Sequence, residues 1–453
     1  MLVGELSGLV GGEYVLHGEA AAAYDRDATG RRGVEGRADA VVLPGSPAEA
    51  AAVVAWCYEH DVAMVPRGGG TGLVGGAVAI AGGVIISLER LRAIRELTPE
   101  LWRMYVEAGV STSHVQRLAR ENGLLFAPDP GASEQSQIGG NVATNAGGPH
   151  ALKYGVTGAW VAGLEVVLAP GELVELGGWA KKDVAGYDLT SLMVGSEGTL
   201  GLITAVRLRL LPAREATEAL VVFLEDRRRG CEAMLAVMAA GMEPSALEFI
   251  DGATLEILAA GYPGEVPTGA GFAVIAEVDG SRSEVAAELS GLEELLGTTA
   301  VAIERSADPR ALWRWRDGAN GTVAGARGGK VSEDVVFPVE LLEEGLERFE
   351  EIAERHGLAP CAWGHGGDGN VHASVLVDPA SDADLDAAAA VGEELFEVVI
   401  SLGGSIAAEH GIGWLKHGRL AAQWPAAAVE LHEQIKRTFD PKGLFNPGKK
   451  VAR

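Results

Sequence analysis

A run of glycines at the end of an apolar strand restricts the fold of this chain more than any other feature. Residues 40–43 predict a strand, Ser46-Pro47 supplies a helix N-cap and a first-turn proline, and residues 48–60 predict the helix that follows. Residues 62–65 predict the next strand, and Arg67-Gly68-Gly69-Gly70-Thr71-Gly72 begins at its end. The order strand, helix, strand, glycine loop is typical of a fold that mixes helices with sheet.

The glycine run has the composition of a cradle for a phosphorylated ligand. Four glycines among these residues let the backbone turn tightly and direct several N–H groups at one anion. No Gly-Lys-Ser/Thr follows, and the next segment predicts a strand, so neither a P-loop nor a dinucleotide-binding G-x-G-x-x-G motif is present. Taken alone, the run is equally compatible with a glycine-rich hairpin that binds nothing.

Two further small-residue regions favour a ligand. The first is formed by Pro128-Asp129-Pro130-Gly131 together with residues 138–148, and the second by residues 195–204. Three such regions in one part of the chain indicate one extended ligand that lies against the backbone.

The pattern restarts after Pro212, which closes the strand predicted over residues 203–210. Strands at 220–224, 246–250 and 272–278 then alternate with helices, which indicates a second α+β domain. The C-terminal tail carries two aromatic residues of buried type and is expected to return to the first domain. The predicted divisions are an N-terminal lead-in (1–35), a first domain (36–214), a second domain (215–405) and a returning C-terminal segment (406–453).

Composition excludes several classes of protein. With 453 residues, 47% of them hydrophobic and 22% charged, the chain should fold into two or three globular domains. A net charge of -26 argues against nucleic acid and anionic lipid as partners. Cys57, Cys231 and Cys361 match neither a disulfide framework nor an iron–sulfur motif, which favours the cytoplasm. The uncharged run 68–88 contains eight glycines, and we expect no transmembrane segment.

Two patches near the C-terminus carry the residues suited to chemistry. They are Gly364-His365-Gly366-Gly367-Asp368-Gly369-Asn370-Val371-His372 and Glu409-His410-Gly411. Two imidazoles, a carboxylate and a further histidine form a set that suits a divalent transition metal beside a base. His372 should share one face of a strand with Asn370 and Ser374, whereas the direction of His365 stays open among its glycines. The alternative is that these are hydrogen-bonded structural histidines.

Together, the motifs PRGGGTGL, PDPG…IGGNVATNAGG, YG, GSEGTLGLIT and FNPGK resemble the FAD-linked oxidases of the vanillyl-alcohol oxidase type. Within that group, the chain is most similar to the D-2-hydroxy-acid dehydrogenase branch, which includes D-lactate and D-2-hydroxyglutarate dehydrogenases and the glycolate oxidase flavoprotein subunit. The resemblance covers nearly the whole chain and implies an α+β fold: a two-part FAD-binding domain and a substrate (cap) domain with an antiparallel sheet.

The resemblance also assigns cofactor residues. The pyrophosphate would lie on the first loop, Ile203 near the adenine and Asn446 over the isoalloxazine. Thr71 stands where relatives with covalent flavin carry a histidine, so we expect non-covalent FAD. The full set is Pro66, Arg67, Gly68, Gly69, Gly70, Thr71, Gly72, Leu73, Pro128, Ser133, Gly139, Gly140, Asn141, Asn145, Gly148, Glu197, Gly201, Ile203 and Asn446.

By the same resemblance, His365, His372 and Glu409 would bind a divalent metal, with zinc expected first and manganese or iron as alternatives. His410 would be the catalytic base. Three further residues would bind the substrate, and Asn320, where some relatives carry threonine, leaves the side-chain pocket open. These residues are Arg316, Asn320 and Lys330.

The sequence therefore predicts an FAD- and metal-dependent dehydrogenase that oxidises a D-2-hydroxy acid of the lactate, hydroxyglutarate or glycolate class. An oxygen-using flavin alcohol oxidase is one alternative, and a flavoprotein subunit that is inactive without partner chains is another. The electron acceptor could be a quinone, a cytochrome or an electron-transfer flavoprotein. A homodimer is compatible with the sequence. The sequence does not identify the exact substrate, the metal, the electron acceptor or the oligomeric state of the protein.

Overall fold

The computed structural model describes residues 2–306 and 308–450 and divides the chain into two compact units. Unit 1 comprises Met1–Gly147, Val156–Ala213 and Glu409–Arg453, and unit 2 comprises Gly148–Gly155 and Arg214–Ala408. The chain therefore passes between the units at four peptide bonds. The sequence divisions had no counterpart for the short segment 148–155, which begins at the end of the second glycine region inside the first predicted domain.

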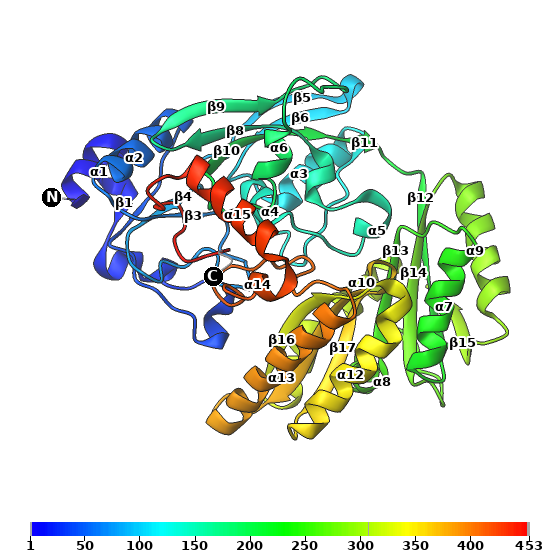
Figure 1. The fold of residues 1–453 in the computed structure, drawn as a ribbon. Helices are drawn as coiled ribbons and strands as arrows, with labels where there is room; N and C mark the ends of the chain where they lie inside the picture. The colour runs from blue at the N-terminus through cyan, green and yellow to red at the C-terminus, as the bar shows by residue number, and fades with distance from the viewer. Residues whose placement is uncertain (1, 307, 451–453) are drawn as a thin grey trace. The chain divides into compact units, whose positions relative to one another are not determined.

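Unit 1 begins with a four-stranded sheet in the order β1-β2-β4-β3, in which β2, β4 and β3 run parallel (Figure 1). These strands are β1 (Val15–Leu16), β2 (Ala40–Val42), β4 (Val84–Ser87) and β3 (Met64–Arg67). Helix α2 (Pro47–Glu59) connects β2 to β3; Ser46 caps its N-terminus by accepting a hydrogen bond from the Glu49 N–H at 3.2 Å. Its buried residues recur with helical spacing and face the core: Ala50, Val53, Val54 and Cys57.

The second sheet of unit 1 is antiparallel, in the order β5-β6-β10-β8-β9. Its strands are β5 (Ile94–Thr98), β6 (Arg103–Glu107), β10 (Leu202–Arg209), β8 (Val161–Leu168) and β9 (Glu172–Gly177), and a small ladder joins β7 (Leu124–Leu125) to β11 (Leu211–Pro212). The remaining α-helices of unit 1 are α1 (Leu2–Val10), α3 (Thr112–Glu121), α4 (Ile138–Thr144), α6 (Leu189–Met193), α14 (Leu420–Gln423) and α15 (Ala426–Phe439).

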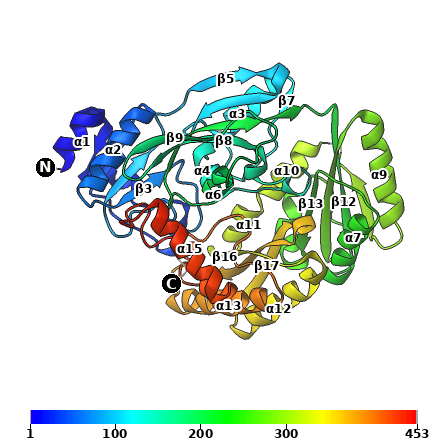
Figure 2. The ribbon, with the colours of Figure 1, turned by 45° about the horizontal axis from the view of Figure 1, so that its top comes forward.

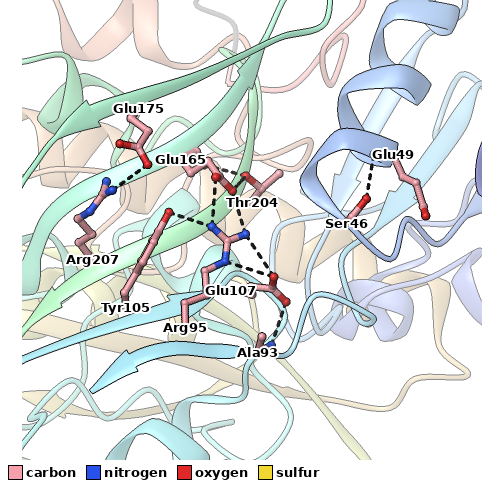
Figure 3. Close-up of polar contacts among 10 residues, drawn as sticks. All are labelled: Ser46, Glu49, Ala93, Arg95, Tyr105, Glu107, Glu165, Glu175, Thr204 and Arg207. Atoms are coloured by element: carbon pink, nitrogen blue, oxygen red, sulfur yellow. Dashed lines mark hydrogen bonds and ion pairs between the residues drawn. The ribbon is translucent and has the colours of Figure 1, made fainter. Parts of the chain in front are cut away.

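A charged ladder crosses this second sheet (Figure 3). The Arg95 guanidinium on β5 donates to Glu107 on β6 at 3.2 Å and to both carboxylate oxygens of Glu165 on β8 at 3.1 Å. Thr204 on β10 donates to the same Glu165 carboxylate at 2.8 Å. The Glu165 side chain is only 11% exposed, so its charge depends on these donors.

Replacing Arg95 by methionine should lower the free energy of unfolding by about 2–4 kcal/mol, because two largely buried carboxylates lose their cation. Glu175→Gln is the matched control: this carboxylate pairs with Arg207 in the same sheet but is 59% exposed, so its loss should cost under about 1 kcal/mol. Urea unfolding of both variants measures the difference. Equal effects would show that the ladder is a surface feature.

Both ends of the chain contribute to the core of unit 1. The N-terminal segment 1–35, predicted as a lead-in, contributes to the core, because Leu6 of α1 is fully buried against the parallel sheet. At the other end, Phe445 is also fully buried, and the Met64 N–H of β3 donates to the Leu444 carbonyl at 2.7 Å. The tail thus returns to the first glycine loop, as its aromatic residues indicated.

Unit 2 is built on one seven-stranded antiparallel sheet in the order β15-β12-β14-β13-β17-β18-β16. The strands are β15 (Ala302–Arg305), β12 (Ala216–Leu224), β14 (Phe272–Gly280), β13 (Ala246–Asp251), β17 (Ala359–His365), β18 (Asn370–Val377) and β16 (Gly329–Val336). Its α-helices are α5 (Ala151–Tyr154), α7 (Arg227–Ala239), α8 (Gly252–Leu258), α9 (Arg282–Leu296), α10 (Pro309–Asp317), α11 (Ala319–Ala326), α12 (Leu342–Arg355) and α13 (Asp382–Ser401).

Helices cover both faces of this sheet. Leu312 of α10 and Val323 of α11 pack with Ile250, Ile275 and Trp363 on one face. Helices α12 and α13 lie side by side (Figures 1 and 2). Helix α12 contacts β17, and helix α13 contacts β16. Among the described residues, no helix is both long enough and apolar enough to cross a bilayer.

Two buried carboxylates of β14 hold the segment 148–155 in unit 2. Glu277 accepts hydrogen bonds from His150 at 2.7 Å, and Asp279 accepts from Lys153 at 2.7 Å and Tyr154 at 2.6 Å. This short segment therefore belongs to the second unit, although the residues on both sides of it belong to the first.

Candidate functional site

The first glycine loop follows β3 in unit 1 and leaves its amide groups available. An added Cβ at Gly69 would lie 2.1 Å from the Gln135 carbonyl oxygen, so no larger residue fits there. Gly70 has a φ of +67°, a conformation that favours glycine. Within the described residues, the N–H groups of Gly69, Gly70, Thr71 and Gly72 donate to no protein acceptor. This geometry fits an anion cradle.

Arg67 braces this loop from inside the protein. Its guanidinium is buried and donates to the carbonyl oxygens of Arg26 at 2.8 Å and Ala77 at 3.1 Å. Burial lowers the pKa of this guanidinium, and the nearby Asp27 carboxylate opposes the shift. The side chain thus fixes the loop shape, whereas the loop backbone faces outward.

The three glycine regions meet in unit 1. The Gly195 N–H donates to the Val142 carbonyl at 2.9 Å and the Glu197 N–H to the Ala143 carbonyl at 2.7 Å, which joins the third region to the second. An added Cβ at Gly198 would lie 3.0 Å from Pro66, so the third region also contacts the first. The structure therefore brings together the three regions that the sequence separates.

The remaining cofactor candidates differ in how they are held. Asn145 has a φ of +54° and accepts the Gly158 N–H at 2.8 Å, and buried Asn141 donates to Thr112 at 2.6 Å. Ser196 and Gln137 each bury a side-chain oxygen that has no partner among the described residues. Further candidates also lie in or beside the three regions, except that Gly148 belongs to unit 2: Pro128, Ser133, Gly139, Gly140, Gly148, Gly201 and Ile203. Unpartnered polar atoms beside free amides fit a polar, phosphorylated cofactor such as FAD.

The C-terminal segment fastens these loops. Asn446 donates to the Gly76 carbonyl at 2.9 Å and to the Glu197 carbonyl at 2.8 Å, so it links the segment just after the first loop to the third region. The Glu197 carboxylate accepts the N–H groups of Ile412 at 3.0 Å and Gly413 at 2.7 Å. The side chains of Glu197 and Asn446 thus join the C-terminal segment to other segments of unit 1.

The first loop supports a specific prediction. Gly69→Ala should distort the loop, because a Cβ at 2.1 Å from a backbone oxygen cannot be relieved by side-chain rotation; we expect a loss of about 1–3 kcal/mol and a lower FAD content. Gly76→Ala is the matched control, since an added Cβ there meets nothing within 4 Å. Flavin absorbance per protein measures both variants. Equal FAD content in the two would contradict the cradle assignment.

The two histidines of the first C-terminal patch come together in unit 2. His365 ends β17, His372 lies on the neighbouring β18, and their ring centroids are 5.4 Å apart. The turn between them is tightly packed: an added Cβ at Gly369 would lie 2.1 Å from the Phe337 carbonyl oxygen. The direction of His365, which strand periodicity left open, is therefore toward His372.

Two carboxylates of unit 2 lie beside these histidines. The fully buried Glu248 of β13 contacts His365 Nδ1 at 2.6 Å, and Asp334 of β16 lies 3.8 Å from His372 Nδ1. Asp334 also accepts hydrogen bonds from Asn370 at 2.9 Å and from the Ala408 N–H at 3.0 Å. Metal-binding histidines commonly contact a carboxylate through the ring nitrogen that does not bind the ion, so this arrangement fits a metal.

Arg316 of α10 is placed beside the histidine pair. Its buried guanidinium forms an ion pair with Glu248, and its Nε–H has no acceptor among the described residues. Burial alone raises the pKa of the Glu248 carboxyl, but Arg316 and His365 outweigh this effect and hold the pKa below its ordinary value. A buried cation with an unused donor fits recognition of a carboxylate.

The other predicted substrate residues differ in their surroundings. The Lys330 ammonium on β16 donates to Ser332 and lies 5.0 Å from the ring centroid of Trp363. Ser332 and Ser374 pair across β16 and β18 at 2.6 Å. Asn320 on α11 is exposed. Lys330 thus extends the polar face of β18 that carries His372, whereas the exposed side chain of Asn320 forms no hydrogen bond with the described residues of unit 2.

Glu409 and His410 belong to unit 1. Glu409 lies against the second glycine region, because an added Cβ at Gly147 would be 2.7 Å from its Oε2. His410 Nε2 is 3.8 Å from Glu409 Oε1. In the chain, Glu409 directly follows Ala408, the residue of unit 2 that donates to Asp334.

The strand predicted over residues 246–250 does not by itself single out Glu248, its one charged residue, as a functional residue. A glutamate in the middle of Ala246-Leu247-Glu248-Phe249-Ile250 is itself a signal, since a central strand position rarely carries an unpaired charge.

Comparison with known proteins identifies the family of this chain. Residues 38–177 match the family described as FAD binding domain, and residues 213–450 match FAD linked oxidases, C-terminal domain. The glycolate oxidase subunit GlcD of Bacillus subtilis is 34% identical, covering 95% of this chain and 92% of its own. A D-2-hydroxyglutarate dehydrogenase of Xanthomonas citri is 37% identical, covering 90% and 88%.

A solved structure has the same fold. Substrate-bound p-cresol methylhydroxylase superposes with a TM-score of 0.83 at 19% identity, over 99% of this chain and 95% of its own. The fold is therefore that of the vanillyl-alcohol oxidase type, and the two matched families make the chain a flavoprotein. More particularly, this chain belongs to the FAD-linked oxidases and is an FAD-dependent oxidoreductase.

Proposed function

We propose that this protein oxidises a D-2-hydroxy acid to the 2-oxo acid with the help of a divalent metal. The observation that carries the proposal is the group in unit 2: a buried guanidinium beside two imidazoles whose ring centroids are 5.4 Å apart. A 2-hydroxy acid offers a carboxylate for the cation and a hydroxyl to be deprotonated. Two relatives, one named for glycolate and one for D-2-hydroxyglutarate, support this substrate class.

The roles follow from side-chain chemistry. Arg316 would bind the substrate carboxylate through two parallel N–H groups, and Lys330 would add a second positive charge. Asn320 would lie beside the substrate side chain. His410 would take the proton of the hydroxyl group, and bound FAD supplies the acceptor for the hydride of the α-carbon.

His365, His372 and Glu409 would hold the metal. Nitrogen and oxygen donors in this number suit zinc first, with manganese or iron as alternatives. The ion would act as a Lewis acid toward the substrate hydroxyl. Support for Glu409 comes from the chain itself, because the residue before it, Ala408, is bonded to the strand pair that carries His372.

The test is anaerobic reduction of the bound flavin by a panel of D- and L-2-hydroxy acids, with and without a chelator. We expect bleaching by a D acid that the chelator abolishes and added metal restores. Bleaching by simple alcohols, with peroxide formed under air, would instead identify an oxygen-using oxidase. Acid precipitation should release the yellow colour, since Thr71 offers no histidine for covalent flavin attachment.

A second candidate is a flavoprotein subunit that is inactive without partner chains. The name of the Bacillus subtilis relative, a glycolate oxidase subunit, favours it. Turnover of the purified protein with an artificial dye acceptor would separate the two candidates. The natural electron acceptor of this protein would be a quinone, a cytochrome or an electron-transfer flavoprotein. The three buried cysteines carry no disulfide, which supports the cytoplasm as its location.

A further inference from the structure

We propose that Glu248 is a positioning residue that couples the metal site to the substrate site: one carboxylate orients both His365 and Arg316. This inference rests on the proposed function and adds a residue that neither the sequence reasoning nor the comparisons assign. Glu248 lies on β13, between β14 and β17, and its side chain has no solvent exposure. All three residues belong to unit 2.

The contact with His365 selects one tautomer of its ring. An ionised carboxylate can only accept hydrogen bonds, so the 2.6 Å contact requires that His365 Nδ1 carries the proton. In the neutral ring, Nε2 then keeps its lone pair, the form needed to bind a metal ion. Arg316 Nη2 lies 3.4 Å from the same Nδ1, but both atoms carry protons, so the shared carboxylate joins them.

The contact with Arg316 orients its guanidinium. The ion pair with Glu248 uses Nη2, and a second, longer contact of 3.9 Å joins Nη1 to Asp317. Because the guanidinium is planar, fixing Nη2 also fixes the direction of Nε–H, which has no acceptor among the described residues. Glu248 thus turns the unused donor edge of Arg316 toward a ligand.

Burying the ionised carboxylate of Glu248 costs folding free energy, and a positioning role would explain why a carboxylate stands there. Burial of an ionised group in the middle of a sheet is compensated only by close cations and donors. Phe249 and Ile250, the next residues of β13, are fully buried apolar side chains, so the strand could pack without a charge. The location of Glu248 between two candidate functional residues therefore points to positioning.

Glu248→Gln separates the two contacts. A glutamine side chain presents one acceptor and one donor, so it satisfies only one of its two neighbours. If its oxygen accepts from His365, its amide opposes Arg316 and the KM for the D-2-hydroxy acid rises. If its oxygen accepts from Arg316, its amide faces His365 Nδ1, the other tautomer forms, and metal affinity falls. Glu248→Leu removes both contacts.

The experiment uses the FAD-containing protein and Co²⁺ as the metal probe. We expect Glu248→Leu to weaken Co²⁺ binding by about 10- to 100-fold, measured by equilibrium dialysis. Asp251→Asn is the matched control: this carboxylate is on the same strand, is partly buried and caps α8, yet contacts neither candidate residue. It should lower stability without changing Co²⁺ affinity or KM.

A measurement on the unaltered protein keeps the inference falsifiable if a variant fails to fold. With ring-¹⁵N-labelled histidine and His365→Asn for assignment, the metal-free wild type should show Nδ1 protonated and Nε2 free of a proton. The opposite tautomer would overturn the inference. Wild-type affinity and KM in both Glu248 variants would also overturn it, whereas a wild type that binds no Co²⁺ would contradict the proposed function instead.

Discussion

Replacing His410 by alanine should slow reduction of the flavin by substrate about 10²- to 10⁴-fold, while the purified protein stays yellow. In the proposed reaction, the hydroxyl proton would leave as the α-carbon gives up its hydride, and without His410 water would be a weaker and poorly placed base. The backbone just after His410 is fixed by two hydrogen bonds, because the Glu197 carboxylate accepts the N–H groups of Ile412 and Gly413. Alanine should therefore remove the base without displacing the backbone.

Stopped-flow absorbance under anaerobic conditions measures this effect directly. His432→Ala is the matched control: this exposed histidine of α15 stacks on Trp424 with a centroid distance of 4.0 Å and belongs to the same C-terminal part of unit 1. It should reduce flavin at the parent rate. If His410→Ala also kept that rate with a D-2-hydroxy acid that reduces the wild type, the assignment of the base would be wrong.

The sequence predicts the regular elements of this fold well where periodicity is strong. The strand predicted to carry His372 is β18, and His372 shares its face with Asn370 and Ser374 as alternation requires. The helix predicted over 48–60 is α2, shifted by one residue. These positions are local, because side-chain alternation and an N-cap depend only on neighbours in the chain.

What the sequence could not predict depends on contacts between distant segments. His365 follows Gly364 and precedes two more glycines, and its direction is fixed by Glu248, more than a hundred residues earlier. The segment 148–155 reads as part of the first domain, yet its hydrogen bonds go to Glu277 and Asp279 of β14. Pairing across such separations leaves no periodic signal.

The candidate site shows the same division. The glycine regions could be recognised because three of them occur in one part of the chain, and the structure brings them together. Glu197 and Asn446 were assigned to the cofactor by resemblance, and the structure adds that their side chains tie the C-terminal segment to the loops. Lys449 is buried in the same segment, so we expect the stability of the protein to depend on pH through its ammonium.

Replacing Lys449 by methionine should remove a dependence of stability on pH. The free energy of unfolding of the wild type, measured relative to that of Lys449→Met, should rise by up to about 5 kcal/mol between pH 7 and pH 10.5. Lys449 is 2% exposed, and burial lowers its pKa from 10.5 to about 7, with Arg67 acting in the same direction and Asp27 and Glu197 opposing. A lysine with a lowered pKa destabilises the folded protein while it is charged. Above pH 7 the folded form has lost this proton but the unfolded chain keeps it until about pH 10.5, so stability increases with pH.

The Lys449 ammonium donates to the Gly76 carbonyl at 3.1 Å, to the Val78 carbonyl and to the Asn446 side chain at 2.7 Å, so methionine removes both the charge and these bonds. Urea midpoints measured from pH 7 to pH 10 at one fixed FAD concentration give the difference between the two proteins. Lys442→Met is the matched control, because this lysine of the same segment is 41% exposed and pairs with the exposed Asp61. Its curve should run parallel to that of the wild type. A Lys449→Met curve that also ran parallel would show that the buried ammonium keeps an ordinary pKa, and that the C-terminal segment is fastened by its hydrogen bonds alone.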